Sequence, residues 1–199
     1  MIGLIRGIIV SKQAPDVIID VQGLGYEVLV SLSTYFEMPN IGSEVLLHTH
    51  FVVRDDAQLL FGFSSLEERA LFRQLIKING VGPKMALAIL SGMSTNEFSR
   101  AVQSNDIDTL VKLPGVGKKT AERLLIEMRD KISLVSENID GLAGQVSDTS
   151  DIKQEAESAL IALGYKPQDA SKMINGVDEN LTESSEQLIR AALKSMVAK

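Results

Sequence analysis

The chain has 199 residues, of which 45% are hydrophobic and 23% charged, and its net charge is −6. This hydrophobic fraction excludes general disorder, and the absence of cysteine excludes disulfides and thiolate metal sites. No apolar run approaches the ~18 residues that a membrane-spanning helix needs, and the first residues lack the layout of a signal peptide. We therefore expect a soluble, cytoplasmic protein with up to three domains and no membrane association.

Residues 1–64 are expected to form a small β-barrel. Short segments rich in β-branched residues predict five strands, at Ile5–Val10, Val17–Val21, Tyr26–Val30, Glu44–Val53 and Gln58–Phe63. The second and third strands are joined through Gly23-Leu24-Gly25, which is a hairpin signal. Five strands in about sixty residues favour an OB-fold, and an SH3-like barrel is the alternative.

The tip between the last two predicted strands is acidic, with the sequence Arg54-Asp55-Asp56. Aspartates are common in solvated turns, so an ordinary hairpin tip is one interpretation. The functional interpretation is that the two carboxylates repel phosphates and exclude ligands of the wrong shape. A metal site is less favoured, because adjacent aspartates point in different directions. His48 and His50 share one face of a strand, but a zinc site would need further ligands that the sequence does not suggest.

After Ser64 the hydrophobic period becomes helical, which predicts an all-α domain at 65–132. Ser64 and Glu67 have the spacing of a capping box at the start of the first helix. Ser94 begins another helix with apolar residues on one face, and Asp106 begins a third.

This region contains an internal repeat. Gly80-Val81-Gly82-Pro83-Lys84 recurs thirty-five residues later as Gly115-Val116-Gly117-Lys118-Lys119. Apolar residues on both sides keep the same register, so we interpret the two copies as one helix–turn–helix unit used twice. Glycine as a simple helix C-cap is the structural alternative. Pro83 removes one backbone donor from the first copy.

The repeat resembles the helix-hairpin-helix motif, which contacts DNA phosphates without reading bases. Glycines allow a close approach, and the free N–H groups of a helix N-terminus attract an anionic oxygen. The predicted phosphate-binding residues are Gly80, Val81, Gly82, Lys84, Gly115, Val116, Gly117, Lys118, Lys119 and Arg123.

The distribution of charge supports a nucleic-acid ligand in spite of the negative total. Residues 1–64 carry three basic and seven acidic side chains, and residues 132–199 carry six and eleven. Residues 65–131 carry eleven basic and eight acidic side chains, so the repeat lies in the only basic stretch. Phosphate binding depends on this local charge more than on the total.

The C-terminal part is expected to be a separate helical module. Residues 133–151 are rich in Ser, Asp, Asn and Gly and predict a flexible linker. Asp151, at the end of the linker, caps a helix that ends at Gly164. Within 152–199, Pro167 begins a second helix, and Thr182 or Ser184 caps a third. So small a three-helix bundle is typical of a docking module.

Several segments together resemble the RuvA family, the Holliday-junction-binding subunit of the bacterial branch-migration complex. They are Met1–Gly7, Thr49–Gln58, Asn79–Lys84, Leu113–Arg123 and Ala162–Pro167. The resemblance implies a multidomain α+β protein with an OB-fold barrel, a tandem helix-hairpin-helix domain and a C-terminal three-helix domain. Two positions depart from the common family pattern: Leu4 stands where relatives often have a basic residue, and Asp55 where they often have Glu.

The resemblance also implies a function and partners. Four subunits would form a homotetramer, or two facing tetramers, that holds an open four-way DNA junction. Asp55 and Asp56 would form an acidic pin at its centre, with Arg54 in support, and residues 152–199 would dock the hexameric RuvB ATPase. The RuvC resolvase is a further expected partner, and the complex would act in recombination, repair and the SOS response.

We therefore expect a non-catalytic DNA scaffold without cofactor or metal. The sequence has no phosphate-binding P-loop and no nucleophile elbow. One alternative is a metal-dependent, structure-specific nuclease subunit that uses Asp55 and Asp56. The other is a general single-strand-binding OB protein, against which the aromatic content of 5% argues.

Overall fold

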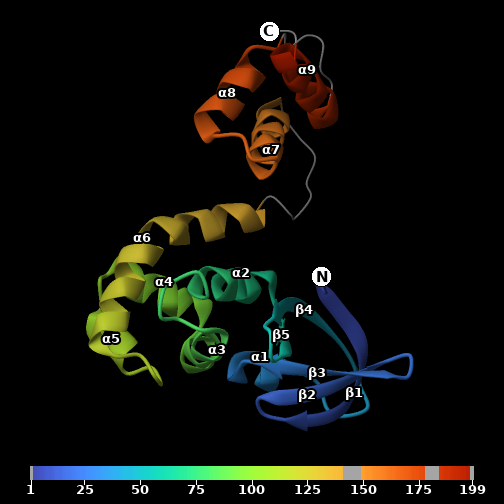
Figure 1. Ribbon diagram of the computed structural model, residues 1–199, viewed down its shortest axis with the longest axis vertical. Helices are drawn as coiled ribbons and strands as arrows, with labels where there is room; N and C mark the ends of the chain where they lie inside the picture. Colours follow the sequence, from blue (N-terminus) through green and yellow to red (C-terminus); the bar gives the residue numbers. More distant parts are fainter. Residues whose placement is uncertain (1, 141–148, 178–183, 198–199) are drawn as a thin grey trace. The chain divides into compact units, whose positions relative to one another are not determined.

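The computed structural model describes residues 2–140, 149–177 and 184–197 (Figure 1). These fall into two compact units, Met1–Asp140 and Gly141–Lys199, each with its own core.

The N-terminal unit begins with a closed barrel whose strands follow the order β1-β2-β3-β5-β4. The strands are β1 (Leu4–Gln13), β2 (Asp16–Val21), β3 (Leu24–Val30), β4 (Glu44–Val53) and β5 (Gln58–Phe63). All neighbours pair antiparallel except β3 and β5, which pair parallel. This topology confirms the predicted five-stranded OB-fold barrel.

Two details of the barrel differ from the prediction. Val21 pairs with Leu24, so the β2–β3 turn consists of Gln22 and Gly23, both at positive φ (54° and 91°). Positive φ at both central residues is the geometry of a type I′ turn, which suits the twist of the strands. The turn therefore lies one residue before the predicted Gly23–Gly25. The structure also contains a short helix, α1 (Leu32–Glu37), between β3 and β4, which the sequence did not predict.

The helical part of this unit packs against β5 of the barrel. It contains α2 (Leu66–Leu75), α3 (Pro83–Gly92), α4 (Thr95–Gln103), α5 (Ile107–Val111) and α6 (Lys118–Asp140). Phe72 of α2 lies 5.0 Å from Phe61 and 4.9 Å from Phe63 of β5, between ring centroids, and all three rings are fully buried. The two rings of β5 therefore belong to the core of the helices, and the rest of the barrel interior forms a second core.

The predicted capping box at Ser64 and Glu67 is wrong by one residue. The N-cap of α2 is Ser65, whose side chain accepts from the Glu68 N–H at 3.1 Å. The Ser64 N–H donates to the Thr34 hydroxyl instead, at 3.0 Å. This contact with a residue 30 positions away fixes the register of the turn. At Ser94, by contrast, Glu97 completes a capping box.

Helix α6 extends to Asp140, into the predicted linker of 133–151. The sequence has no glycine or proline between Lys118 and Asp140, so nothing in it interrupts the helix before Gly141. At the other end, α7 begins at Thr149 rather than after a cap at Asp151. Residues 141–148 lie outside the described residues.

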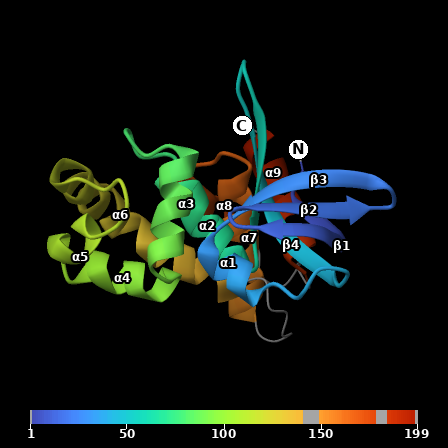
Figure 2. The same ribbon diagram turned by 90° about the horizontal axis from the view of Figure 1, so that it is seen from below.

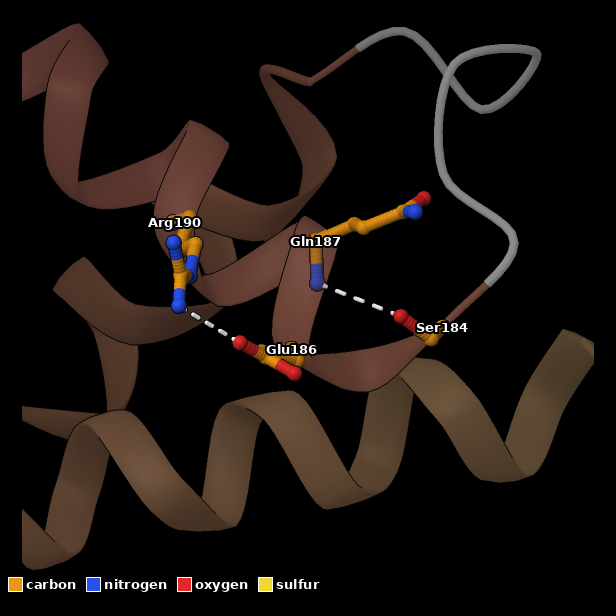
Figure 3. Close-up of polar contacts among 4 residues, drawn as sticks. All are labelled: Ser184, Glu186, Gln187 and Arg190. Atoms are coloured by element: carbon orange, nitrogen blue, oxygen red, sulfur yellow. Dashed lines mark hydrogen bonds and ion pairs between the residues drawn. The ribbon is translucent and has the colours of Figure 1, made fainter.

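The C-terminal unit is a three-helix bundle of α7 (Thr149–Ala162), α8 (Pro167–Asn175) and α9 (Ser185–Val197). Pro167 begins α8 as predicted, and Gly164 follows α7 at a φ of 101°. Figure 3 shows Ser184 accepting from the Gln187 N–H at 3.4 Å and Arg190 paired with Glu186 at 2.7 Å. Ser184 therefore caps α9, whereas Thr182 lies outside the described residues. Within the described ranges, no helix is long and apolar enough to span a bilayer.

Candidate nucleic-acid interface

The first glycine of each Gly-Val-Gly segment makes the turn between two helices. Gly80 and Gly115 have φ values of 89° and 78°, in the left-handed region that glycine occupies at little cost. We refer to residues 80–82 and 115–117 as the first and second glycine turns. Their shared geometry supports the interpretation of the sequence repeat as one structural unit used twice.

The valine of each glycine turn anchors it to the core. The side chains of Val81 and Val116 are each only 4% exposed. Their N–H groups donate to the Ile78 and Leu113 carbonyls, at 3.0 and 3.1 Å. In this structure the two valines therefore shape the turns, and their amides point into the protein.

The second glycine of each segment begins a helix without a side-chain cap. Gly82 is the N-cap of α3, with φ −82° and ψ 168°, and no side chain bonds to this helix end. The first backbone bonds of α3 and α6 run from Ala86 to Gly82 and from Ala121 to Gly117, both at 2.9 Å. The N–H groups before Ala86 and Ala121, including those of the lysines, therefore have no acceptor within the helix.

The neighbouring helices, in contrast, have side-chain caps at their N-termini. Side chains of Ser65, Ser94 and Asp106 cap α2, α4 and α5. The two glycine-led helices thus present free donors and a positive helix end where the other helices of this domain are capped.

The space in front of these two helix ends is open. A Cβ atom placed on Gly82 or Gly117 would meet no heavy atom within 4 Å. Lys84, Lys118 and Lys119 are exposed in the first turns of α3 and α6, and none forms an ion pair within the described residues. Each site therefore combines backbone donors, positive charge and room for a ligand.

A side chain of each repeat reaches the glycine turn of the other repeat. Arg123 of α6 donates from Nη1 to the Asn79 carbonyl at 2.8 Å and lies 3.7 Å from the Cβ position of Gly80. In the other direction, Cε of Met85 of α3 lies 3.8 Å from the Cβ position of Gly115. Each helix thus touches the turn of the other repeat, which sets the spacing of the two sites.

The acidic turn, residues 54–57, closes the β4–β5 hairpin. Val53 pairs with Gln58, and the Arg54 N–H donates to the Ala57 carbonyl at 2.8 Å. Figure 2 shows this hairpin standing out from the barrel, and Arg54, Asp55 and Asp56 are all exposed at its tip. No group of three or more potential metal-ligating side chains occurs among the described residues.

His48 and His50 of β4 face α2, where they meet two arginines. The Arg73 Nε–H donates to Nδ1 of His50 at 3.3 Å. Burial, then the nearby arginine charges, lowers the pKa of both histidines, so they are neutral at pH 7. Sequence reasoning missed Arg69 and Arg73 as partners here, because no local pattern relates α2 to β4.

Comparisons with known proteins follow the same division of the chain. Three family models match: "RuvA N terminal domain" at residues 1–62, "SAM-like Helix-hairpin-helix tandem" at 72–130, and "RuvA, C-terminal domain" at 151–197. A relative from Vibrio vulnificus (strain YJ016) is 54% identical over 99% of this chain and 100% of its own. The chain belongs to the RuvA family.

Other RuvA relatives are equally similar. Proteins from Shewanella piezotolerans and Vibrio cholerae (strain O395) are each 55% identical, again over 99% of this chain and their full length. All three relatives are described as "Holliday junction branch migration complex subunit RuvA". The RuvA N-terminal match corresponds to the barrel, and the helix-hairpin-helix match spans both glycine turns.

Proposed function

We propose that this protein binds four-way (Holliday) DNA junctions without sequence specificity, as the DNA-binding subunit of a branch-migration complex. The observation that carries the proposal is the pair of uncapped, lysine-bearing helix N-termini at the two glycine turns, held together in one unit. Membership of the RuvA family supports the choice of ligand, because the relatives' description names the Holliday junction.

The two glycine turns account for affinity. A phosphate oxygen at Gly82 or Gly117 would accept hydrogen bonds from the free N–H groups and meet the charge of Lys84, Lys118 or Lys119. These donors contact the DNA backbone and not the base edges, so binding is independent of sequence. Gly80, Gly115, Val81 and Val116 contribute by shaping the turns.

The acidic turn accounts for the choice of DNA shape. Asp55 and Asp56 project from a barrel whose strand β5 packs into the core of the domain that carries the glycine turns, so the carboxylates and the phosphate sites belong to one packed unit. Negative charge there repels phosphates. In a homotetramer, four such tips would meet where the four arms diverge and favour an open, planar junction, with Arg54 bound beside the strands.

The C-terminal unit is proposed to recruit the motor. Its three helices have their own small core, and its family match is the RuvA C-terminal domain. We assign residues 152–199 to docking of the RuvB ATPase, which would supply the ATP hydrolysis while this subunit remains non-catalytic. RuvC at the junction and a second tetramer on its other face belong to the same proposal.

The test compares a synthetic four-way junction with a linear duplex of the same arm sequence. Asp55→Asn and Asp56→Asn together remove both charges at nearly constant volume, and we expect the preference for the junction to fall while duplex affinity is unchanged. Glu27→Gln with Glu44→Gln, two exposed barrel carboxylates, is the control with the same change of charge. A double variant that retains the full preference would refute the role of the acidic turn.

The nuclease alternative gives a different result in the same assay. Labelled junction is incubated with the purified protein and Mg²⁺, and the strands are separated on a denaturing gel. Intact strands with a shifted complex on a native gel agree with a scaffold. Cleavage that the Asp55→Asn and Asp56→Asn variant abolishes would refute the non-catalytic assignment.

A further inference from the structure

Glu68 is a buried carboxylate with no cationic partner. It is the third residue of α2 and is only 6% exposed, yet it forms no ion pair among the described residues. Its two oxygens accept hydrogen bonds from the hydroxyls of Ser31 and Thr34, at the start of α1, the second at 2.6 Å. A buried charge is costly unless hydrogen bonds satisfy it, so this arrangement needs an explanation beyond stability.

Among the described residues, the hydroxyls of Ser31 and Thr34 have no acceptor other than Glu68 for their hydrogens. Ser31 Oγ accepts from the Thr34 N–H at 3.0 Å, and Thr34 Oγ1 accepts from the Ser64 N–H at 3.0 Å. Each hydroxyl therefore accepts from the backbone and donates to the carboxylate. The network joins three segments: the start of α1, the connection from β5 to α2, and the first turn of α2.

Helix α1 is bonded to α3 as well. The Leu32 N–H donates to Ser91 Oγ, and the Ser33 hydroxyl donates to the Leu90 carbonyl, both at 2.9 Å. Because α1 lies in the chain between β3 and β4, these bonds tie the barrel to α2 and α3, the two helices on either side of the first glycine turn. Helix α1 therefore connects the barrel, which carries the acidic turn, to the helices beside the first glycine turn through bonds of defined direction.

The shared apolar core does not supply this directionality. Packing of Phe61, Phe63 and Phe72 holds the barrel against the helices, but the hydrophobic effect is not directional. Hydrogen bonds to a charged group depend strongly on distance and angle. The network around Glu68 therefore helps to fix the rotation of the barrel relative to the helices, whereas the aromatic core holds the two in contact. Two further bonds between α2 and the barrel act in the same way, from Arg69 to the Gly3 carbonyl at 2.8 Å and from Arg73 to His50 at 3.3 Å.

We propose that Glu68 is a positioning residue for junction recognition. By holding α1 against α2 and α3, it sets the direction of the acidic turn relative to the two glycine turns. This inference rests on the proposed function, in which a junction must meet both features at once. A linear duplex needs only the glycine turns, so loss of the network weakens junction binding selectively.

The test uses the full-length protein with Glu68→Gln, which keeps the volume but leaves one acceptor oxygen for two hydroxyls. We expect the ratio of junction to duplex affinity to fall by roughly tenfold, the equivalent of one net hydrogen bond to a charged group. Duplex affinity stays within about twofold, the scatter expected of a neutral change. Glu67→Gln, the adjacent exposed carboxylate, is the matched control.

A distance measurement separates positioning from general stability. The chain has no cysteine, so spin labels at Gln58→Cys and Gln103→Cys report the distance between the hairpin of the acidic turn and α4. We expect one narrow distribution in the parent and a broader or shifted one with Glu68→Gln, at a temperature where both are folded. Ser91→Ala removes the acceptor of the Leu32 N–H, together with the bond from the Ser91 hydroxyl to the Leu87 carbonyl within α3, and should shift both readouts in the same direction.

The outcomes discriminate between the two proposals. Unchanged distance and unchanged junction preference with Glu68→Gln would overturn the positioning role. An equal fall of the junction and duplex affinities would also overturn the positioning role, because that result indicates a structural role only. A parent protein that does not prefer junctions would refute the proposed function, and the spin-label distances would still decide whether Glu68 fixes the domain orientation.

Discussion

Substitution of alanine for the second glycine of each glycine turn tests the contact with DNA at nearly constant stability of the fold. Gly82 has φ −82°, which any residue can adopt, and the φ of Gly117 is also outside the left-handed region. At both positions a Cβ would meet nothing within 4 Å. Alanine as an N-cap costs about 0.5–1 kcal/mol relative to glycine, and the loss of backbone freedom in the unfolded chain returns about 0.4–1 kcal/mol. We therefore expect Gly82→Ala with Gly117→Ala to melt within about 3 °C of the parent.

The first glycine of each turn gives the opposite result for stability. At Gly80 and Gly115 the φ values of 89° and 78° force alanine into the left-handed region. This costs about 1–2 kcal/mol per position, which lowers the melting temperature by about 2–8 °C in a domain of this size. Thermal unfolding monitored by circular dichroism distinguishes the two pairs of glycines.

Duplex binding is expected to depend directly on Gly82 and Gly117, the two positions at which alanine leaves the stability nearly unchanged. A methyl group on residue 82 or 117 stands where a phosphate oxygen must approach the helix N-terminus. Loss of one charge-assisted hydrogen bond costs about 1.5–3 kcal/mol, so each substitution weakens duplex binding by roughly tenfold or more. Fluorescence anisotropy at fixed salt measures this, and Gly3→Ala, at another open glycine, is the control. Unchanged affinity for the Gly82→Ala, Gly117→Ala variant would refute a close approach of phosphate.

Four further measurements test other parts of the reasoning. Lys118→Gln with Lys119→Gln should reduce the slope of log K against log salt by about 1.8, because each phosphate contact contributes about 0.9; an unchanged slope would contradict their role. Phe72→Ala removes the ring shared by the barrel and the helices and should cost about 3–5 kcal/mol in chemical denaturation. Burial raises the pKa of Glu68 above 4.5, so the folded chain binds that proton more tightly than the unfolded chain. The free energy of unfolding of the parent, taken relative to that of Glu68→Gln, should therefore be highest below pH 4.5. It should fall as pH rises to the raised pKa of Glu68 and stay level above that pKa. A chain of residues 1–140, which contains both cores of its unit, should bind junctions in gel shifts but fail to stimulate branch migration by RuvB.

Features that local chemistry determines could be predicted from the sequence. The repeated glycine turns follow from a conformational need at Gly80 and Gly115 together with helical periodicity on either side. Ser94 and Pro167 marked helix starts, because a serine side chain caps the first turn and the fixed φ of proline suits the first helical position. In each case the residues that decide the structure lie within a few positions of one another.

Features that depend on distant contacts could not be predicted in the same way. Glu67 and Glu68 are neighbours with the same chemistry, and contacts with Ser31 and Thr34, 37 and 34 residues away, bury only Glu68. The N-cap at Ser65 follows from the same network. Helix α1 has six residues, too few for a periodic pattern, and bonds to α2 and α3 hold it. The polar composition after residue 132 suggested a linker, but composition alone does not end a helix that lacks glycine and proline.

Under the proposed function, the contacts between the two repeats explain how two weak phosphate sites can be sufficient. Arg123 donates to the Asn79 carbonyl beside Gly80, and Met85 lies against Gly115, so each repeat fixes the turn of the other. Once one site holds a phosphate, the second meets the same backbone at a fixed spacing, and its binding becomes an intramolecular step with a high effective concentration. The guanidinium of Arg123 has further N–H donors beyond the one bonded to Asn79, so it can contact a phosphate while it maintains that spacing. In the proposed function, sequence-independent affinity would thus follow from the geometry of the repeat, and the direction of the acidic turn would determine which DNA shapes can bind.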